Sequence, residues 1–210
     1  MSRLRKPQIS SRKEPKQARS TDLVAAVLEA AVQVLAKEGA QRFTTARVAE
    51  KAGVSVGSLY QYFPNKAAIL FRLQSNEWRQ TSELLSSILM DTGQPSHDRL
   101  RALVHAFIRS ECEEAAVRVA LSDAAPLYRD APEARKAKAS GEQAIKAFMR
   151  EILPELSAAK RTLAGDLIMT TLSQVGKDFS SSKRGSSEIK SYADALADML
   201  IAYLKALQRN

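Results

Sequence analysis

The sequence predicts an all-α protein of about nine helices, in which a three-helix helix-turn-helix unit precedes a larger helical body. Three observations support this fold class. Apolar residues recur at helical spacing through most of the 210 residues, capping and turn residues separate these runs, and a hydrophobic content of 45% is enough for a packed core.

The first expected helix begins at Thr21 or Asp22 and ends at Gly39. Its apolar residues follow helical spacing and are Val24, Val27, Leu28, Ala31, Val34 and Leu35. The preceding residues 1–18 are basic, contain Ser and Pro and show no periodicity, so we expect a flexible basic arm. Such an arm is either a disordered end or an additional contact to nucleic acid phosphates or a minor groove.

Two short helices meeting at a sharp turn follow. The first covers residues 44–52, is capped by Thr44 or Thr45, and ends at Gly53, which is able to adopt a left-handed conformation. Ser55 caps the next helix, and Leu59 returns an apolar face to the preceding helices. Small and polar residues remain on the outer face, which suits a helix that enters a major groove; they are Val56, Gly57, Ser58 and Gln61.

The segment from about Thr21 to Leu70 resembles the DNA-binding domain of TetR-type transcriptional regulators. The matching residues are Ala30, Ala31, Leu35, Gly39, Phe43, Thr44, Thr45, Val48, Ala49, Ala52, Gly53, Val54, Ser55, Gly57, Ser58, Leu59, Tyr60, Tyr62, Phe63, Asn65 and Lys66. This resemblance implies a sequence-specific DNA-binding regulator.

The resemblance also assigns roles to individual residues. Thr44, Thr45, Tyr62 and Lys66 are similar to phosphate contacts, and the outer face of the second short helix is similar to a base-reading face. Arg47 is a candidate phosphate contact. Tyr60 either packs in the core of the DNA-binding domain or reaches a phosphate. The expected DNA-contacting residues are therefore Thr44, Thr45, Arg47, Ser55, Val56, Gly57, Ser58, Tyr60, Gln61, Tyr62 and Lys66.

Charge is distributed in agreement with this division. Residues 1–66 contain twelve Lys or Arg and five Asp or Glu, a net charge of +7, whereas residues 67–210 contain twenty and eighteen, a net charge of +2. Positive charge supplies most sequence-independent DNA affinity. We therefore expect a basic arm at 1–18, a DNA-binding domain at 19–66, and an effector-binding and dimerisation domain at 67–210.

The body is expected to contain further helices. One long helix covers about 66–90, and Ser96 caps the next after the break at 91–95. A short apolar piece at 117–121 precedes a loop at 125–132, and Pro132 begins a helix that ends near 153.

Two long amphipathic helices end the chain, at about 155–179 and 187–207. By periodicity alone, this pair either closes the chain's own core or forms an interface. The resemblance favours a homodimer, in which the two helices pair with their counterparts. The expected interface residues are Leu167, Thr171, Val175, Leu196, Leu200 and Tyr203.

The resemblance further implies a repressor that leaves a palindromic operator when a small molecule binds the body. An apolar or amphipathic effector is expected, because the candidate lining residues are mixed apolar and aromatic. They are Trp78, Phe107, Glu111, Tyr128, Phe148, Met149, Met169 and Gln174. The alternative is a DNA-binding structural or activating protein whose body binds another protein.

Other classes of function find little support. The residues show no clustered nucleophile, base and orienting group, so we expect neither an enzyme nor a cofactor. Cys112, His97 and His105 do not form a usual zinc site, and the carboxylates beside Cys112 disfavour a redox-active thiol. The chain has no apolar run of membrane-spanning length, so we expect a soluble cytoplasmic protein.

Overall fold

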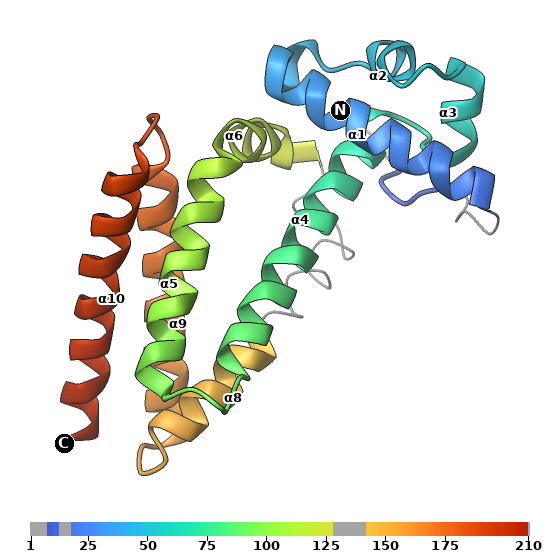
Figure 1. The fold of residues 1–210 in the computed structure, drawn as a ribbon. Coiled ribbons are helices and arrows are strands. Elements are labelled where there is room, and N and C mark those ends of the chain that lie inside the picture. The colour runs from blue at the N-terminus through green and yellow to red at the C-terminus, as the bar shows by residue number, and fades with distance from the viewer. Residues whose placement is uncertain (1–7, 13–17, 128–141, 210) are drawn as a thin grey trace, which may run out of the picture. The chain divides into compact units, whose positions relative to one another are not determined.

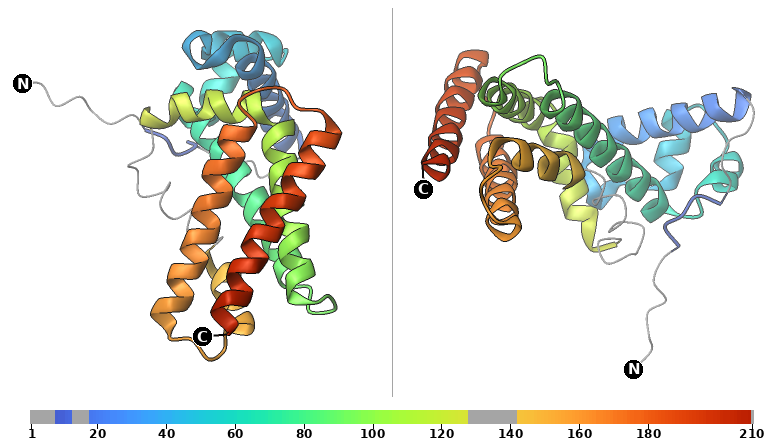
Figure 2. Two further views of the ribbon diagram at one scale, coloured as in Figure 1. Left: turned by 90° about the vertical axis from the view of Figure 1, so that its left-hand side faces the viewer. Right: turned by 90° about the horizontal axis from the view of Figure 1, so that it is seen from below.

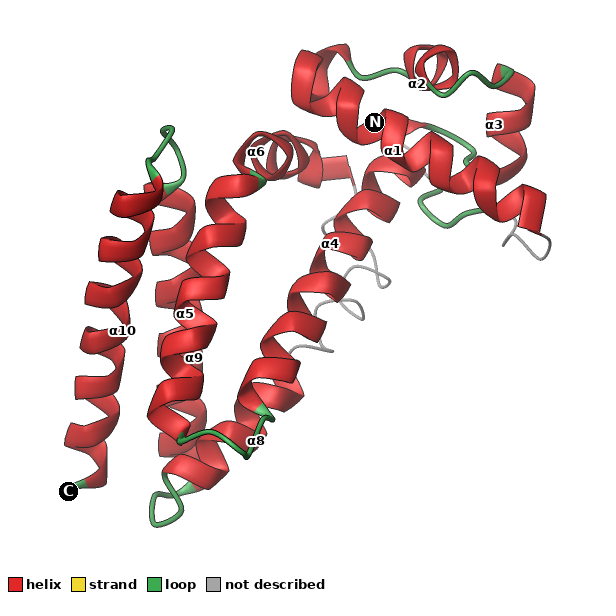
Figure 3. Cartoon of the chain, in the orientation of Figure 1, coloured by secondary structure: helices red, strands yellow, loops and turns green. Residues whose placement is uncertain are grey.

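The computed structural model describes residues 8–12, 18–127 and 142–209, and its elements are helical (Figures 1 and 3). These residues form nine α-helices and one 3₁₀ turn and contain no strand, which confirms the predicted fold class. The helices are α1 (Ala18–Arg42), α2 (Thr45–Lys51), α3 (Val56–Tyr62), α4 (Lys66–Leu89), α5 (Ser96–Glu113), α6 (Ala115–Ala124), η1 (Ala125–Leu127), α8 (Glu142–Ile152), α9 (Ala158–Phe179) and α10 (Ser186–Gln208).

The chain divides into two compact units. The first comprises Met1–Trp78 and Ala116–Ala137, and the second comprises Arg79–Ala115 and Lys138–Asn210. The first unit therefore extends beyond the expected boundary at residue 66. The reason is packing: Ile69 and Leu73 of α4, and Leu121 of α6, are buried in the same hydrophobic cluster as α1, α2 and α3.

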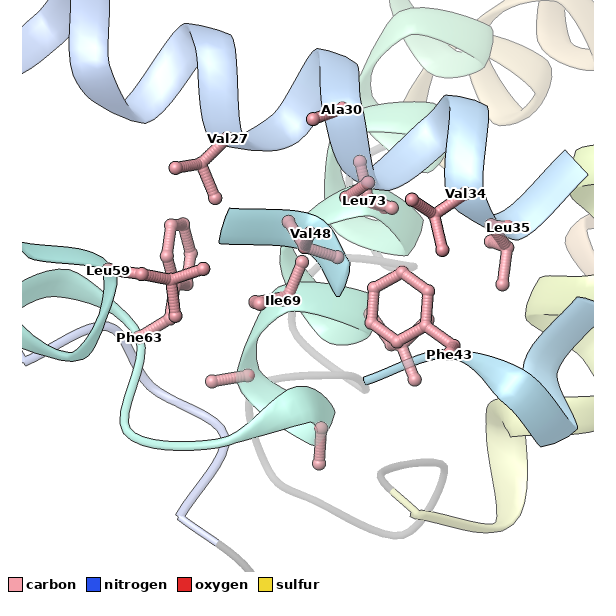
Figure 4. Packing of buried hydrophobic residues seen from close by; sticks show 14 of the residues in the cluster. Val27, Ala30, Val34, Leu35, Phe43, Val48, Leu59, Phe63, Ile69 and Leu73 are labelled. Carbon is pink, nitrogen blue, oxygen red and sulfur yellow. The ribbon is translucent and has the colours of Figure 1, made fainter. Parts of the chain in front are cut away.

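The core of the first unit is assembled from one face of each short helix (Figure 4). Phe43, Val48, Leu59 and Ile69 are each no more than 1% exposed. They come from the α1–α2 connection, α2, α3 and α4, so burial of these side chains holds the short helices α2 and α3 against α4 and the end of α1. The half-buried ion pair between Arg118 Nη1 and Glu77 Oε1, at 2.7 Å, also joins α6 to α4.

The predicted break at Gly39 is a kink within α1. Gly39 has a φ of 73° and a ψ of 172°, which is not helical, although helical hydrogen bonding resumes up to Arg42. Gly39 therefore ends the first helical segment, as the sequence predicts, and a short second helical segment up to Arg42 follows it across the kink.

The second unit is organised around α5, which packs against α9 and α10, while α8 packs against α9 (Figure 2). Small residues allow close approach of these helices. A Cβ added to Gly176 of α9 would lie 3.0 Å from both Phe107 and Glu111 of α5, and one added to Gly165 would lie 3.3 Å from Met149 of α8.

The expected body helices are present, but the expected loop at 125–132 and the helix start at Pro132 cannot be compared in full. The expected 125–132 loop begins as the 3₁₀ turn Ala125–Leu127, and its remaining residues lie outside the described part of the chain, as does the expected start at Pro132. No helix among the described residues is both long and apolar enough to cross a membrane.

Candidate nucleic-acid interface

The turn between α2 and α3 is built from local capping interactions. Thr44 caps α2 by accepting a hydrogen bond from the Arg47 backbone N–H at 3.3 Å, and Ser55 caps α3 by accepting one from the Ser58 N–H at 3.0 Å. Between them, Gly53 has a φ of 66°, and the Val54 N–H donates to the Ala49 carbonyl at 3.0 Å. This is a Schellman ending, in which a left-handed residue satisfies the last carbonyls of the helix.

The outer face of α3 carries the expected base-facing residues. Val56 is 39% exposed, and Gly57 and Gln61 are also exposed, whereas Leu59 is fully buried. Ser58 is half-buried, and its hydroxyl lies 2.8 Å from that of Ser55. The face is therefore low in bulk, with Gln61 as its longest polar side chain.

Phosphate candidates from α2 and α3 lie together. The Thr45 hydroxyl is 3.1 Å from the Tyr60 hydroxyl, and Tyr60 is 38% exposed. Either hydroxyl is able to donate in this pair. Tyr60 is thus an exposed polar group rather than a core residue, and it links the start of α2 to α3.

Of two other phosphate candidates, the exposed Arg47 is ion-paired within the protein and Tyr62 is buried. Arg47 forms an ion pair with Glu38 and donates to the Arg42 carbonyl at 3.2 Å, so its guanidinium is directed toward the end of α1. Tyr62 is only 8% exposed and belongs to the core of the first unit. Lys66, in contrast, is exposed in the first turn of α4, which contains no acidic residue.

Sequence reasoning missed residues 8–12, which we name the N-terminal strap. They fall within the expected flexible arm, yet Ile9 is only 6% exposed and lies in the core of the first unit. The Arg12 N–H donates to the Tyr62 carbonyl at 2.9 Å, and Asn65 Nδ2 donates to the Gln8 carbonyl at 2.9 Å. The expectation of a flexible arm therefore does not hold for residues 8–12; an isoleucine among basic and polar residues was the available signal.

The structure brings some, but not all, of the candidate effector residues together. Phe107 and Glu111 of α5 are buried beside Gly176, and Phe148 and Met149 of α8 are buried in the same hydrophobic cluster of the second unit, where Met169 is partly buried. Three candidates differ: Gln174 is exposed, Trp78 belongs to the first unit, and Tyr128 lies outside the described residues.

The candidate dimer residues divide between the core and the surface. Leu167 is 49% exposed, and Thr171, Val175 and Tyr203 are half-buried. Leu196 and Leu200 differ, because they are 7% and 3% exposed and pack in the core of their own chain. The exposed large apolar residues of α10 are instead Tyr192, at 36%, and Met199, at 53%.

The single thiol lies in surroundings that disfavour the thiolate. Burial raises the pKa of Cys112, and the nearby charge of Glu111 raises it further, while Arg184 acts in the opposite direction. Within the described ranges, no group of three or more His, Cys, Asp or Glu has the geometry to hold a metal ion.

Comparisons with known proteins match both parts of the chain. Residues 27–73 match the family model described as bacterial regulatory proteins, tetR family, and residues 95–207 match the tetracyclin repressor-like C-terminal domain. A nucleoid occlusion factor SlmA from Alteromonas mediterranea is 45% identical over 49 residues, which is 23% of this chain and 25% of that protein. The chain spans between 25% and 40% of the length of the curated relatives it matches.

Solved structures share the fold over most of the chain. The fatty acid degradation regulator FadR from Bacillus halodurans superposes with a TM-score of 0.65 at 19% identity, covering 89% of this chain and 96% of that one. FadR from Bacillus subtilis, in complex with stearoyl-CoA, has a TM-score of 0.61 at 17% identity, covering 84% and 96%. At these identities the likeness concerns the fold.

Proposed function

This chain belongs to the TetR family of transcriptional regulators, which bind DNA and are not enzymes, and on that basis we propose that it is a homodimeric repressor released from a palindromic operator by a small molecule. The observation that carries the proposal is the exposed face of α3. Its residues Val56, Gly57 and Gln61 point outward from a helix fixed by its Ser55 cap and its buried Leu59.

The chemistry of this face suits direct reading of a major groove. A glutamine is able to bond to adenine in bidentate fashion, and a valine methyl is able to contact a thymine methyl. No Arg or Lys occurs in α3, so guanine recognition requires a residue outside this helix. The proposed operator half-site is therefore read mainly at A·T pairs by α3.

Dimerisation is supported by the apolar surface of α9 and α10. Leu163 and Leu167 of α9, with Met199 of α10, are between 49% and 66% exposed. One DNA-binding domain makes few base contacts, whereas two such domains spaced about 34 to 36 Å apart read successive major grooves of one palindrome. A two-fold dimer therefore increases both affinity and the length of DNA that is read.

Release by a small molecule requires that the ligand prefer one arrangement of the protein. In the described part of the chain, the backbone crosses between the two compact units within α4, after Trp78, and at the beginning of α6, after Ala115. Ligand binding in the second unit would thus act on the first through continuous helical backbone at the α4 crossing. The complex of the Bacillus subtilis FadR with stearoyl-CoA makes a long-chain acyl-CoA the first effector to test.

The proposal is tested by selecting duplexes from a random DNA pool with the purified protein at two salt concentrations. We expect one palindromic sequence with two half-sites about one helical turn apart. Adding stearoyl-CoA to the selected complex, with coenzyme A alone as the control, then tests release. Recovery of unspecific DNA, lost as salt rises, would contradict sequence-specific regulation.

A second function has its own support, because two of the curated relatives are nucleoid occlusion factors. In this alternative, the protein binds DNA and its helical body binds another protein. Two results together would favour this alternative. The selected duplex would not be released by an acyl-CoA or other small molecule, and a second protein would co-purify with this chain in a manner that depends on the exposed face of α9.

A further inference from the structure

The N-terminal strap, residues 8–12, is held against the end of α3 and the start of α4 at three points. The side chain of Ile9 is buried in the core of the first unit. The Gln8 carbonyl accepts from Asn65 Nδ2, and the Arg12 N–H donates to the Tyr62 carbonyl, both at 2.9 Å. Figure 4 shows this segment as the pale blue coil that passes below α3.

Asn65 connects the strap to the beginning of α4. Its Oδ1 accepts from the Ala68 N–H at 2.9 Å and so caps α4, while its Nδ2 holds the Gln8 carbonyl. Both ends of one amide are therefore used. The residue that fixes the first turn of α4, where Lys66 is exposed, also fixes the course of the strap.

Arg12 supplies a positive charge that α3 itself lacks at its end. No basic residue occurs in the last turn of α3, whose final carbonyls carry partial negative charge. The Arg12 guanidinium donates to the Tyr60 carbonyl at 3.5 Å, and the Arg12 side chain is exposed. A long hydrogen bond to one carbonyl leaves most of the five guanidinium donors available.

We propose that the strap is part of the DNA-binding surface and that Arg12 binds a backbone phosphate beside those expected at Tyr62 and Lys66. This inference rests on the proposed DNA-binding function of the same unit. Arg12 lies along the chain from an anchored Ile9 and is bonded to the backbone of Tyr60 and Tyr62. The positive charge of Arg12 is thus held beside the end of α3, because the strap is anchored to the first unit.

Full-length variants distinguish this role from bracing alone. Arg12→Gln removes the charge and keeps the anchor, Arg12→Lys restores the charge, and Ile9→Ser removes the anchor without changing the charge. Arg109→Gln, an exposed position on α5 in the second unit, is the matched control for net charge. Binding to the selected duplex is measured by fluorescence anisotropy from 50 to 200 mM salt, with circular dichroism to verify folding.

We expect Arg12→Gln to reduce the slope of log K against log salt by about 0.9 per DNA-binding domain, which changes the ratio of wild-type to variant affinity by about 3.5-fold per domain between 50 and 200 mM salt. Arg12→Lys should restore the slope, Ile9→Ser should reduce it, and Arg109→Gln should leave it unchanged. An unchanged salt slope for Arg12→Gln would overturn the proposal. A loss of DNA affinity in Ile9→Ser alone would show that the strap only stabilises the first unit. Failure of the wild-type protein to bind any duplex would refute the proposed function instead.

Discussion

Replacing Lys66 with Gln should change DNA binding and protein stability in opposite directions. Lys66 is exposed in the first turn of α4, and that turn contains no acidic residue. A cation at a helix N-terminus is unfavourable by about 0.3–1 kcal/mol because the helix dipole is positive there. The position suits a lysine when a phosphate lies in front of it.

The magnitude of the binding effect follows from counterion release. Loss of one phosphate contact reduces the salt slope by about 0.9 per head, or about 1.8 for a dimer. Between 50 and 200 mM salt, this difference changes the ratio of wild-type to variant affinity by about twelvefold. The free energy of unfolding should rise by a few tenths of a kcal/mol in the absence of DNA.

Tyr62→Phe is the paired substitution, since the buried ring of Tyr62 must be kept. The phenylalanine preserves packing in the core of the first unit and removes only the hydroxyl. A hydrogen bond to a charged phosphate is worth about 1.5–3 kcal/mol, so affinity should fall for every sequence without a change in salt slope. Tyr62→Ala would confound the measurement, because a core cavity of this size costs about 3–5 kcal/mol of stability.

Anisotropy titrations across the salt range and thermal denaturation without DNA measure both quantities. A salt slope for Lys66→Gln equal to that of the wild type would refute the assignment of Lys66 as a phosphate contact. A reduced slope for Tyr62→Phe would refute the separation between the ionic and hydrogen-bonding contacts.

Four further predictions address other parts of the molecule. Gln61→Ala should relax the base preference at one position of each half-site by about 1–3 kcal/mol without changing the salt slope, as measured by repeating the duplex selection. Leu167→Glu should convert the proposed dimer to a monomer in sedimentation equilibrium, because the exposed leucine would become a charge within the interface. Leu172→Ala should lower the free energy of unfolding by about 2–5 kcal/mol, since Leu172 is fully buried, as measured by urea denaturation. Because burial raises the pKa of Cys112, its alkylation by iodoacetamide should be slower than that of an exposed thiol at pH 8 and should accelerate as the pH rises toward that pKa; equal rates would contradict the prediction.

The helices of the head could be predicted because their limits are set locally. The Thr44 and Ser55 caps and the left-handed Gly53 act within a few residues, and each is present in the structure. The strap could not be predicted in this way, because its contacts join Gln8 to Asn65 and Arg12 to Tyr62, which are far apart in the sequence. Ion pairing of Arg47 with Glu38 likewise depends on the bend of α1 at Gly39.

The body was harder to predict because its tightest contacts are made by small residues. The periodicity of large apolar residues predicted α9 and α10 but did not separate the core-facing side of each helix from its exposed side. Leu196 and Leu200, which face the core, were therefore expected at the interface with Tyr203. In the structure, α5 and α10 approach each other through Ala193 and Ala197 as well as these leucines. An alanine or glycine contributes little to an apolar pattern, even where it decides which face of a helix packs.

Which residues of α9 are buried also bears on whether the final two helices close the chain's own core or form an interface. Helices that only closed their own core would bury their largest apolar side chains and expose their small ones. α9 does bury Ile168 and Leu172 together with the small residues Ala164, Gly165 and Gly176, but Leu163 and Leu167 on its outer face are 66% and 49% exposed. Large apolar side chains on an outer face are expected where a second surface covers them. The division within α9 therefore favours a surface completed by another chain, for which the two-fold partner proposed above is sufficient.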